Sequence, residues 1–186
     1  MVTTLMAICM MPLSFLATII AEEKEKHTLR TLMLSGVSAV EFITSKILVT
    51  LLLTEAINVI NYFVVGFPLI KLPFYLLVTV LGSLPLLMLG AAIGILSKDQ
   101  MATGALSAPL MLVFLMPSML QMLNPIVEKI AYFTPVEQMM RIFTLWSNGG
   151  SLLSASTLYS LLIILGWTII GLVMFIFAYK KKRLDE

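Results

Sequence analysis

Long apolar runs separated by short polar stretches dominate this chain. A helix rises about 1.5 Å per residue, so about 20 apolar residues cross the roughly 30 Å hydrocarbon core of a bilayer. Five runs reach that length, and they cover residues 2–21, 47–70, 73–97, 101–123 and 154–179. The pattern therefore predicts an all-α integral membrane protein with one transmembrane domain over residues 1–186.

The stretch 22–46 interrupts this pattern between the first two runs. Seven of its first nine residues are charged or histidine: Glu22, Glu23, Lys24, Glu25, Lys26, His27 and Arg30. Leu29, Leu32 and Met33 follow at the i, i+3, i+4 spacing of an apolar helical stripe. We therefore expect an amphipathic helix over residues 22–34.

Two further signals in 22–46 predict a turn and a second helix. Gly36 suits the left-handed conformation that commonly ends a helix. Ser38 and Glu41 have the spacing of a capping box, in which each side chain satisfies a backbone N–H at a helix start. A helix should begin there and continue through Lys46 into the second apolar run.

Residues 124–150 are too short for two membrane crossings but are rich in apolar positions. Helical apolar spacing runs through Phe133, breaks at Thr134-Pro135, and restarts at Val136. Two short amphipathic helices that lie in the membrane interface or dip into it fit this pattern. Two helices packed as a lid over a bundle cavity fit it as well, and the sequence leaves both arrangements open.

Three polar residues fall on one face of the second run: Glu55, Asn58 and Asn61. A charged residue deep in a membrane helix costs about 2.5–3.5 kcal/mol on insertion scales. The face should therefore meet the bundle interior, a dimer contact or a wet cavity. This polar face can be explained either as the lining of a substrate path or by hydrogen bonding between helices. In the third run, Gly90 and Gly94 form a G-x-x-x-G pair, which we expect to allow close helix packing within the chain.

Composition and charge fix the class and the expected orientation. The chain is 60% hydrophobic and 12% charged, about half the charged fraction of a soluble domain. Basic residues mark the cytoplasmic side of membrane proteins. With the C-terminus inside, nine Lys and Arg residues lie inside and three, Lys71, Lys129 and Arg141, lie outside. Five spans then place Met1 outside, so we expect one span to be missing before Met1.

Catalytic motifs are missing from the sequence. It has no G-x-x-x-x-G-K-[ST] phosphate-binding loop, no H-E-x-x-H and no G-x-S-x-G. One His and the single Cys9 leave too few ligands for a typical zinc site. We therefore expect no enzyme activity, no metal site and no cofactor in this chain, and nothing indicates a nucleic-acid partner.

The stretch 22–46 resembles the cytosolic signature of bacterial ABC exporter permeases of the type-2 class. The matching residues are Glu23, Lys24, Glu25, Thr28, Leu29, Leu32, Val37, Ser38, Glu41 and Lys46. Tyr132-Phe133-Thr134-Pro135 and Arg141-Ile142 are also similar to the segment before that family's last span. The family has six spans, so the five runs would be spans two to six.

This resemblance implies a membrane-spanning permease subunit of an ATP-driven exporter in a bacterial cytoplasmic membrane. A second permease subunit, identical or not, would complete the substrate path, with Glu55, Asn58 and Asn61 as lining residues. A cytosolic ABC ATPase subunit would bind ATP and magnesium and dock on the stretch 22–46. The expected coupling residues are Glu22, Glu23, Lys24, Glu25, Thr28, Leu29, Leu32, Gly36, Ser38 and Glu41. The alternative is a non-transporting immunity or regulatory protein of the same ancestry.

Overall fold

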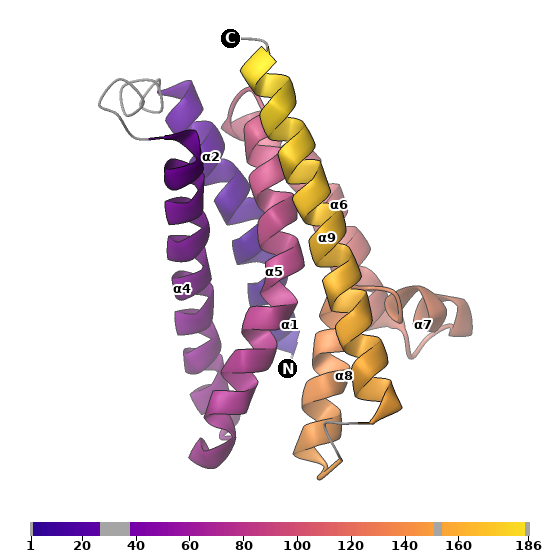
Figure 1. Ribbon diagram of the computed structural model, residues 1–186. Coiled ribbons are helices and arrows are strands. Elements are labelled where there is room, and N and C mark those ends of the chain that lie inside the picture. The colour runs from indigo at the N-terminus through magenta and orange to yellow at the C-terminus, as the bar shows by residue number, and fades with distance from the viewer. Residues whose placement is uncertain (1, 27–37, 151–153, 185–186) are drawn as a thin grey trace.

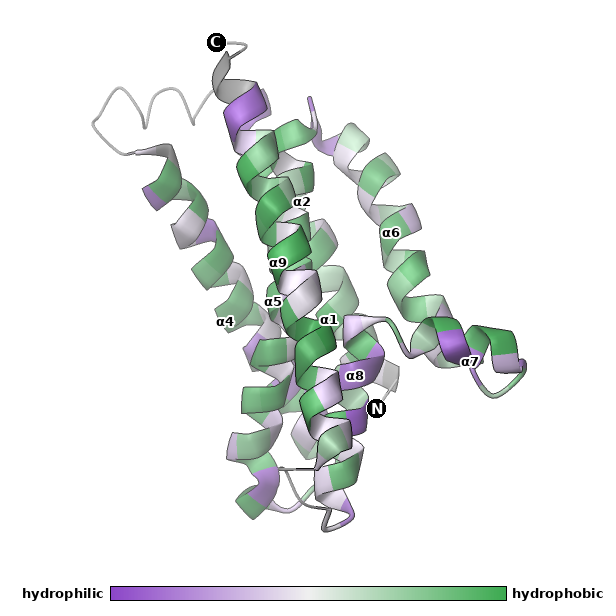
Figure 2. Ribbon diagram, turned by 45° about the vertical axis from the view of Figure 1, so that its right-hand side comes forward, coloured by the Kyte–Doolittle hydropathy of each residue, from purple (hydrophilic) through white to green (hydrophobic). Residues whose placement is uncertain are grey.

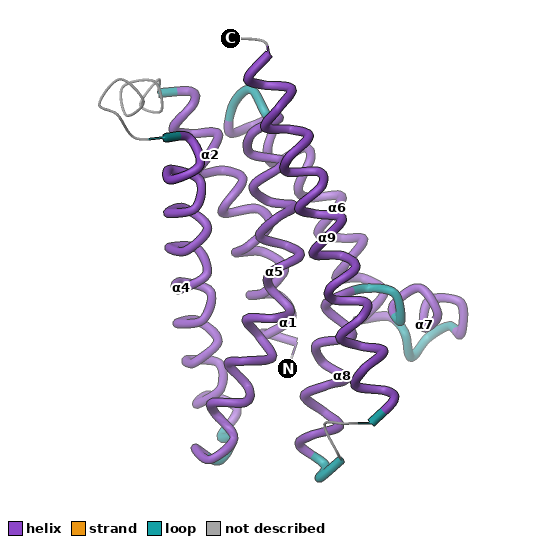
Figure 3. The backbone as a smooth tube through the Cα atoms, viewed as in Figure 1, coloured by secondary structure: helices purple, strands orange, loops and turns teal. Residues whose placement is uncertain are grey.

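Helices form every regular element in the part of the chain that the structure describes. This computed structural model describes residues 2–26, 38–150 and 154–184. Five helical stretches in those ranges are long and apolar enough to cross a membrane, which confirms the predicted fold class (Figures 1 and 3). They are Thr3–Glu25, Val40–Val65, Leu69–Leu96, Gln100–Leu120 and Ala155–Lys181.

The first spanning stretch contains a wide turn in its middle. It consists of α1 (Val2–Cys9), the π-helix η1 (Met10–Phe15) and α2 (Leu16–Glu25). The N–H of Leu16 donates to the carbonyl of Met11, five residues back, as in a π turn. Pro12 lies inside this turn, and its lack of an N–H removes one ordinary helical hydrogen bond. The hydropathy pattern of residues 2–21 carries no sign of this turn.

The boundary between the first span and the charged stretch differs from the prediction. The helix does not stop near Ala21 but continues through Glu25. The four residues Glu22, Glu23, Lys24 and Glu25 are therefore the last turn of α2 and not the start of a separate helix. The rest of the expected amphipathic helix, and the turn at Gly36, fall in residues 27–37, outside the described residues.

The second spanning helix, α4 (Ala39–Val65), begins as predicted. Ser38 Oγ accepts from the N–H of Glu41 at 3.2 Å, and Glu41 Oε2 accepts from the N–H of Ser38 at 2.9 Å. These two bonds confirm the capping box. The helix ends at Gly66, which has a φ of 79°, and Pro68 precedes the short 3-10 turn η2 (Leu69–Lys71). The span is thus several residues shorter at this end than the predicted limit at residue 70.

The central element of the bundle is α5 (Leu72–Leu96). An apolar 18-residue segment of its spanning stretch is 67% buried within the protein, against 22% for the corresponding segment of α4 and 17% for that of α9 (Ala155–Leu184). A Cβ atom on Gly90 would lie 2.3 Å from the carbonyl oxygen of Pro12, and one on Gly94 would lie 2.8 Å from Ile20. The G-x-x-x-G pair therefore packs α5 against the first spanning stretch of the same chain, as predicted.

The remaining helices are α6 (Gln100–Leu120), α7 (Pro125–Ala131) and α8 (Pro135–Ser147). The predicted break at Thr134-Pro135 is confirmed, because Thr134 caps α8. Figures 1 and 2 show α7 standing out sideways from the bundle, whereas α8 runs beside α9. One face of α8 is buried, with Val136, Met139 and Phe143 at 2% exposure or less. Of the two expected interfacial helices, α8 therefore packs within the bundle.

The bundle has two ends, which we call proximal and distal. At the proximal end α2 finishes, α4 begins, the link between α5 and α6 turns, and α9 ends at the C-terminus (Figure 1). The distal end contains η2 and the end of α8, where Lys71 Nζ donates to the carbonyl of Ser147 at 3.0 Å. The three segments that the basic-residue count assigned to one side of the membrane thus share one end of the molecule.

Candidate functional site

At the proximal end, the last turn of α2 is tied to three other helices. The first tie is Lys24, whose Nζ donates to the carbonyls of Ile95 and Ser97, both at 2.5 Å. The last carbonyls of a helix have no partner within the helix, and a cation there also interacts favourably with the helix dipole. Lys24 therefore supplies hydrogen-bond donors to free carbonyls at the C-terminus of α5.

The second tie is Glu25, which reaches the start of α6. Glu25 Oε2 accepts from the N–H of Gln100 at 3.3 Å. Asp99 caps the same helix, because its Oδ1 accepts from the N–H of Ala102 at 2.7 Å. Two carboxylates thus lie where the free N–H groups and the positive end of the helix dipole favour negative charge.

The third tie is an ion pair between α2 and α4. Glu23 Oε1 lies 2.8 Å from Lys46 Nζ, and both side chains are about three-quarters buried, at 26% and 25% exposure. The ammonium of Lys46 also lies 5.2 Å from the ring centre of Phe42. Consecutive residues 23, 24 and 25 therefore connect α2 to α4, α5 and α6 respectively. We call Glu23, Lys24, Glu25 and Lys46, with the helix ends they contact, the proximal junction.

The other predicted coupling residues are placed differently. Lys26 Nζ donates to Glu22 Oε1 at 2.5 Å on the surface, and this hydrogen bond raises the pKa of the Lys26 ammonium. Ser38 and Glu41 bond to each other in the capping box. Thr28, Leu29, Leu32 and Gly36 lie outside the described residues.

Several junction partners were absent from the sequence prediction, including the α5 carbonyls and the N–H of Gln100. A signal for them exists in the order Lys24-Glu25, a cation followed by an anion. The link between α5 and α6 is only three residues long, so it brings a negative helix C-terminus close to a positive N-terminus. The adjacent opposite charges match these two helix ends, but only the tertiary fold shows that they meet.

The polar residues of α4 face the inside of this chain. Glu55 Oε2 accepts from Thr79 Oγ1 of α5 at 2.7 Å, and Asn58 is fully buried. Asn61 is half-buried one turn further along. Glu55 Oε1 and both polar atoms of the Asn58 side chain are buried without a well-formed hydrogen bond in the described part of the chain. Of the two interpretations left open, interhelical hydrogen bonding is present at Glu55.

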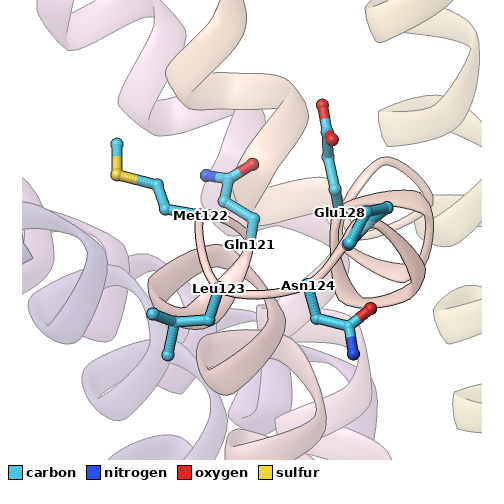
Figure 4. Close-up of a pocket in the computed structure, with 6 residues that line it drawn as sticks. Gln121, Met122, Leu123, Asn124 and Glu128 are labelled. Carbon is cyan, nitrogen blue, oxygen red and sulfur yellow. The ribbon is translucent and has the colours of Figure 1, made fainter.

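Two hollows lie toward the distal end. A cavity of about 570 Å³ is bounded by α1, α6, α8 and α9, with Glu137 and Arg141 in its wall. A second hollow of about 560 Å³ lies over the turn between α6 and α7. In Figure 4 the side chains of Gln121 and Glu128 point to one side of this turn, and Leu123 and Asn124 point to the other. In the described ranges no three His, Cys, Asp or Glu side chains gather to hold a metal ion.

These features define a multi-pass α-helical membrane protein in which Glu23, Lys24 and Glu25 connect α2 to three other helices. The family model of the ABC-2 family transporter proteins matches residues 1–180. The chain belongs to this family and is a permease component of an ABC transporter. Searches of curated proteins and of solved structures found no match.

Proposed function

We propose that this chain is the membrane subunit of an ATP-driven exporter and that the proximal junction couples it to a separate ATPase subunit. The observation that carries the proposal is the connection of three consecutive residues of α2 to three other helices. Residues 27–37 join α2 to α4, so a force on that segment acts directly on the junction. The junction passes the force to α4, α5 and α6 together.

The junction suits two alternative arrangements of the bundle. Its ties are hydrogen bonds and ion pairs at helix ends, and they can break and re-form without unfolding a helix. An ATPase that binds one arrangement more tightly than the other shifts the population toward that arrangement. ATP and magnesium are bound by the ATPase, and this chain supplies the movement.

Orientation and assembly follow from charge and exposure. The nine-to-three distribution of basic residues supports a cytoplasmic location for the proximal end. The resemblance of residues 22–46 to bacterial exporter permeases supports a bacterial cytoplasmic membrane. Large apolar faces of α4, α6 and α9 are exposed in the single chain, because an apolar 18-residue segment of each is only 22%, 28% and 17% buried. Lipid and a second permease subunit cover these faces. Glu55, Asn58 and Asn61 contribute to the substrate path when α4 moves relative to α5.

The experiment that tests this function is mild solubilisation of the chain from its native membrane. We expect a subunit with a phosphate-binding loop to co-purify, identified by mass spectrometry, and its ATP hydrolysis to change when the permease is removed. A chain that purifies alone, or an ATPase whose activity is the same with and without it, contradicts the proposal and favours the non-transporting regulatory alternative.

A further inference from the structure

The distal cavity contains a charged pair that the proposed coupling does not use. Its volume of about 570 Å³ lies in the range of small-molecule sites, roughly 300–1,000 Å³. Glu137 lies in its wall with a side chain only 8% exposed, and Arg141, one turn along α8, pairs with it at 3.1 Å. A carboxylate buried to this extent needs its partners, because an unpaired buried charge is strongly unfavourable.

The Glu137 carboxylate has two partners, one for each oxygen. Its Oε1 accepts from Arg141 Nε, and its Oε2 accepts from Gln121 Nε2 at 3.1 Å. Gln121 Nε2 also donates to the carbonyl of Ser118 at 3.0 Å. The negative charge is therefore matched within the protein, and the carboxylate is not the group that would recognise a ligand.

The unused hydrogen-bonding capacity of the cavity includes donors beside the charged pair. Arg141 uses only Nε for Glu137, and its guanidinium stacks at 4.3 Å from the ring centre of Tyr132. Its two Nη nitrogens make no hydrogen bond within the described ranges. The hydroxyl of Ser118, in the same wall, is buried and has no partner among the described residues. A stacked guanidinium with free Nη groups matches the geometry of a phosphate or carboxylate.

Much of the remaining wall is apolar, and Thr144, Ser156 and Ser160 add hydroxyl groups to it. Leu5 of α1, Met122 after α6, and Met140 and Leu145 of α8 line the same cavity. Flexible methionine side chains adapt to apolar groups of different shapes. A ligand that satisfies both parts of this wall has an anionic head and a hydrocarbon portion.

From this arrangement we propose that the distal cavity binds an anionic amphiphile, with its phosphate or carboxylate on Arg141 and its apolar portion against Leu5, Met122, Met140 and Leu145. The site goes beyond the coupling role, because binding needs neither ATP nor a partner ATPase. The same head-group chemistry occurs in a bilayer lipid and in a free single-chain amphiphile.

The test is native mass spectrometry of the purified full chain with four probes. Oleoyl lysophosphatidic acid carries a phosphate and one chain, monoolein is its neutral counterpart, dioleoyl phosphatidic acid represents bilayer lipid, and inorganic phosphate lacks a chain. We expect the lysophosphatidic acid to bind at least about tenfold more tightly than monoolein, as the loss of a charge-assisted hydrogen bond implies, and phosphate not to bind. Competition by the two-chain probe identifies a lipid site, and its failure to compete identifies a site for a free amphiphile.

Variants assign the binding to this cavity. Arg141→Gln should abolish the preference for the anionic probe and Arg141→Lys should retain part of it, whereas Lys129→Gln, an exposed basic residue of α7, should leave it unchanged. The double variant Glu137→Gln/Arg141→Gln removes both charges and avoids an unpaired Glu137 if the single variant does not fold. Equal binding of monoolein and lysophosphatidic acid to the unmodified chain overturns the proposal. The same conclusion follows if Arg141→Gln and the double variant bind as Lys129→Gln does.

Discussion

Removal of the Lys24 ammonium should open the proximal end of the bundle. Lys24→Met keeps a long apolar side chain but deletes both 2.5 Å bonds to the carbonyls of Ile95 and Ser97. Hydrogen bonds to charged groups contribute about 1.5–3 kcal/mol each. Lys24 is only half-buried, so solvent reduces the combined effect to roughly 2–4 kcal/mol. The open population of this end should then rise about thirtyfold or more.

Amide hydrogen exchange, followed by mass spectrometry on the chain in lipid nanodiscs, measures this opening. Faster exchange is expected in the last turn of α5 and the first turn of α6, with little change in the distal half. Lys24→Arg should stay close to the unmodified chain because it keeps a cation. Lys26→Gln, which removes the surface partner of Glu22, is the matched control for loss of one positive charge. Exchange in Lys24→Met that equals exchange in Lys26→Gln refutes the assigned role of Lys24.

Three further predictions concern other parts of the structure. Gly90→Ala places a Cβ 2.3 Å from the carbonyl of Pro12 and should destabilise the protein by about 1–3 kcal/mol. Gly104→Ala meets open space and should not, so only Gly90→Ala should lower the midpoint of thermal unfolding. Ser38→Ala should cost about 1 kcal/mol of stability through loss of the α4 cap and speed amide exchange in the first turn of α4 and nowhere else. Unchanged exchange in that turn contradicts this prediction. Glu55→Gln keeps an oxygen acceptor and should change the transport rate without changing the yield of folded protein; an unchanged rate removes Glu55 from the substrate path.

Local sequence signals predicted the elements that depend on nearby residues. Hydropathy located the five spans, and the spacing of Ser38 and Glu41 located the start of α4, because the capping box is formed within four residues. Thr134-Pro135 likewise located the start of α8. The small size of Gly90 indicated close packing, since a glycine permits close approach of any neighbouring helix.

Features that depend on distant neighbours were not predictable from the sequence. An apolar stripe on α8 fits a lipid interface and a protein core equally well, so only the fold shows that α8 is buried against α5 and α9. The charges of Glu23, Lys24 and Glu25 indicated a solvated or docking surface, whereas their partners lie more than twenty residues away. The distal cavity could not be predicted from the sequence either, because its wall combines residues from four helices.

The coupling claim is tested most directly by two measurements on one set of complexes. The permease with Lys24→Met is purified with its ATPase beside Lys26→Gln, and both the retained ATPase and the permease-dependent change in ATP hydrolysis are measured. The junction predicts that Lys24→Met retains the ATPase but loses most of the permease-dependent change, while Lys26→Gln retains both. A Lys24→Met complex with unchanged permease-dependent ATP hydrolysis contradicts the claim that the proximal junction transmits movement to the bundle.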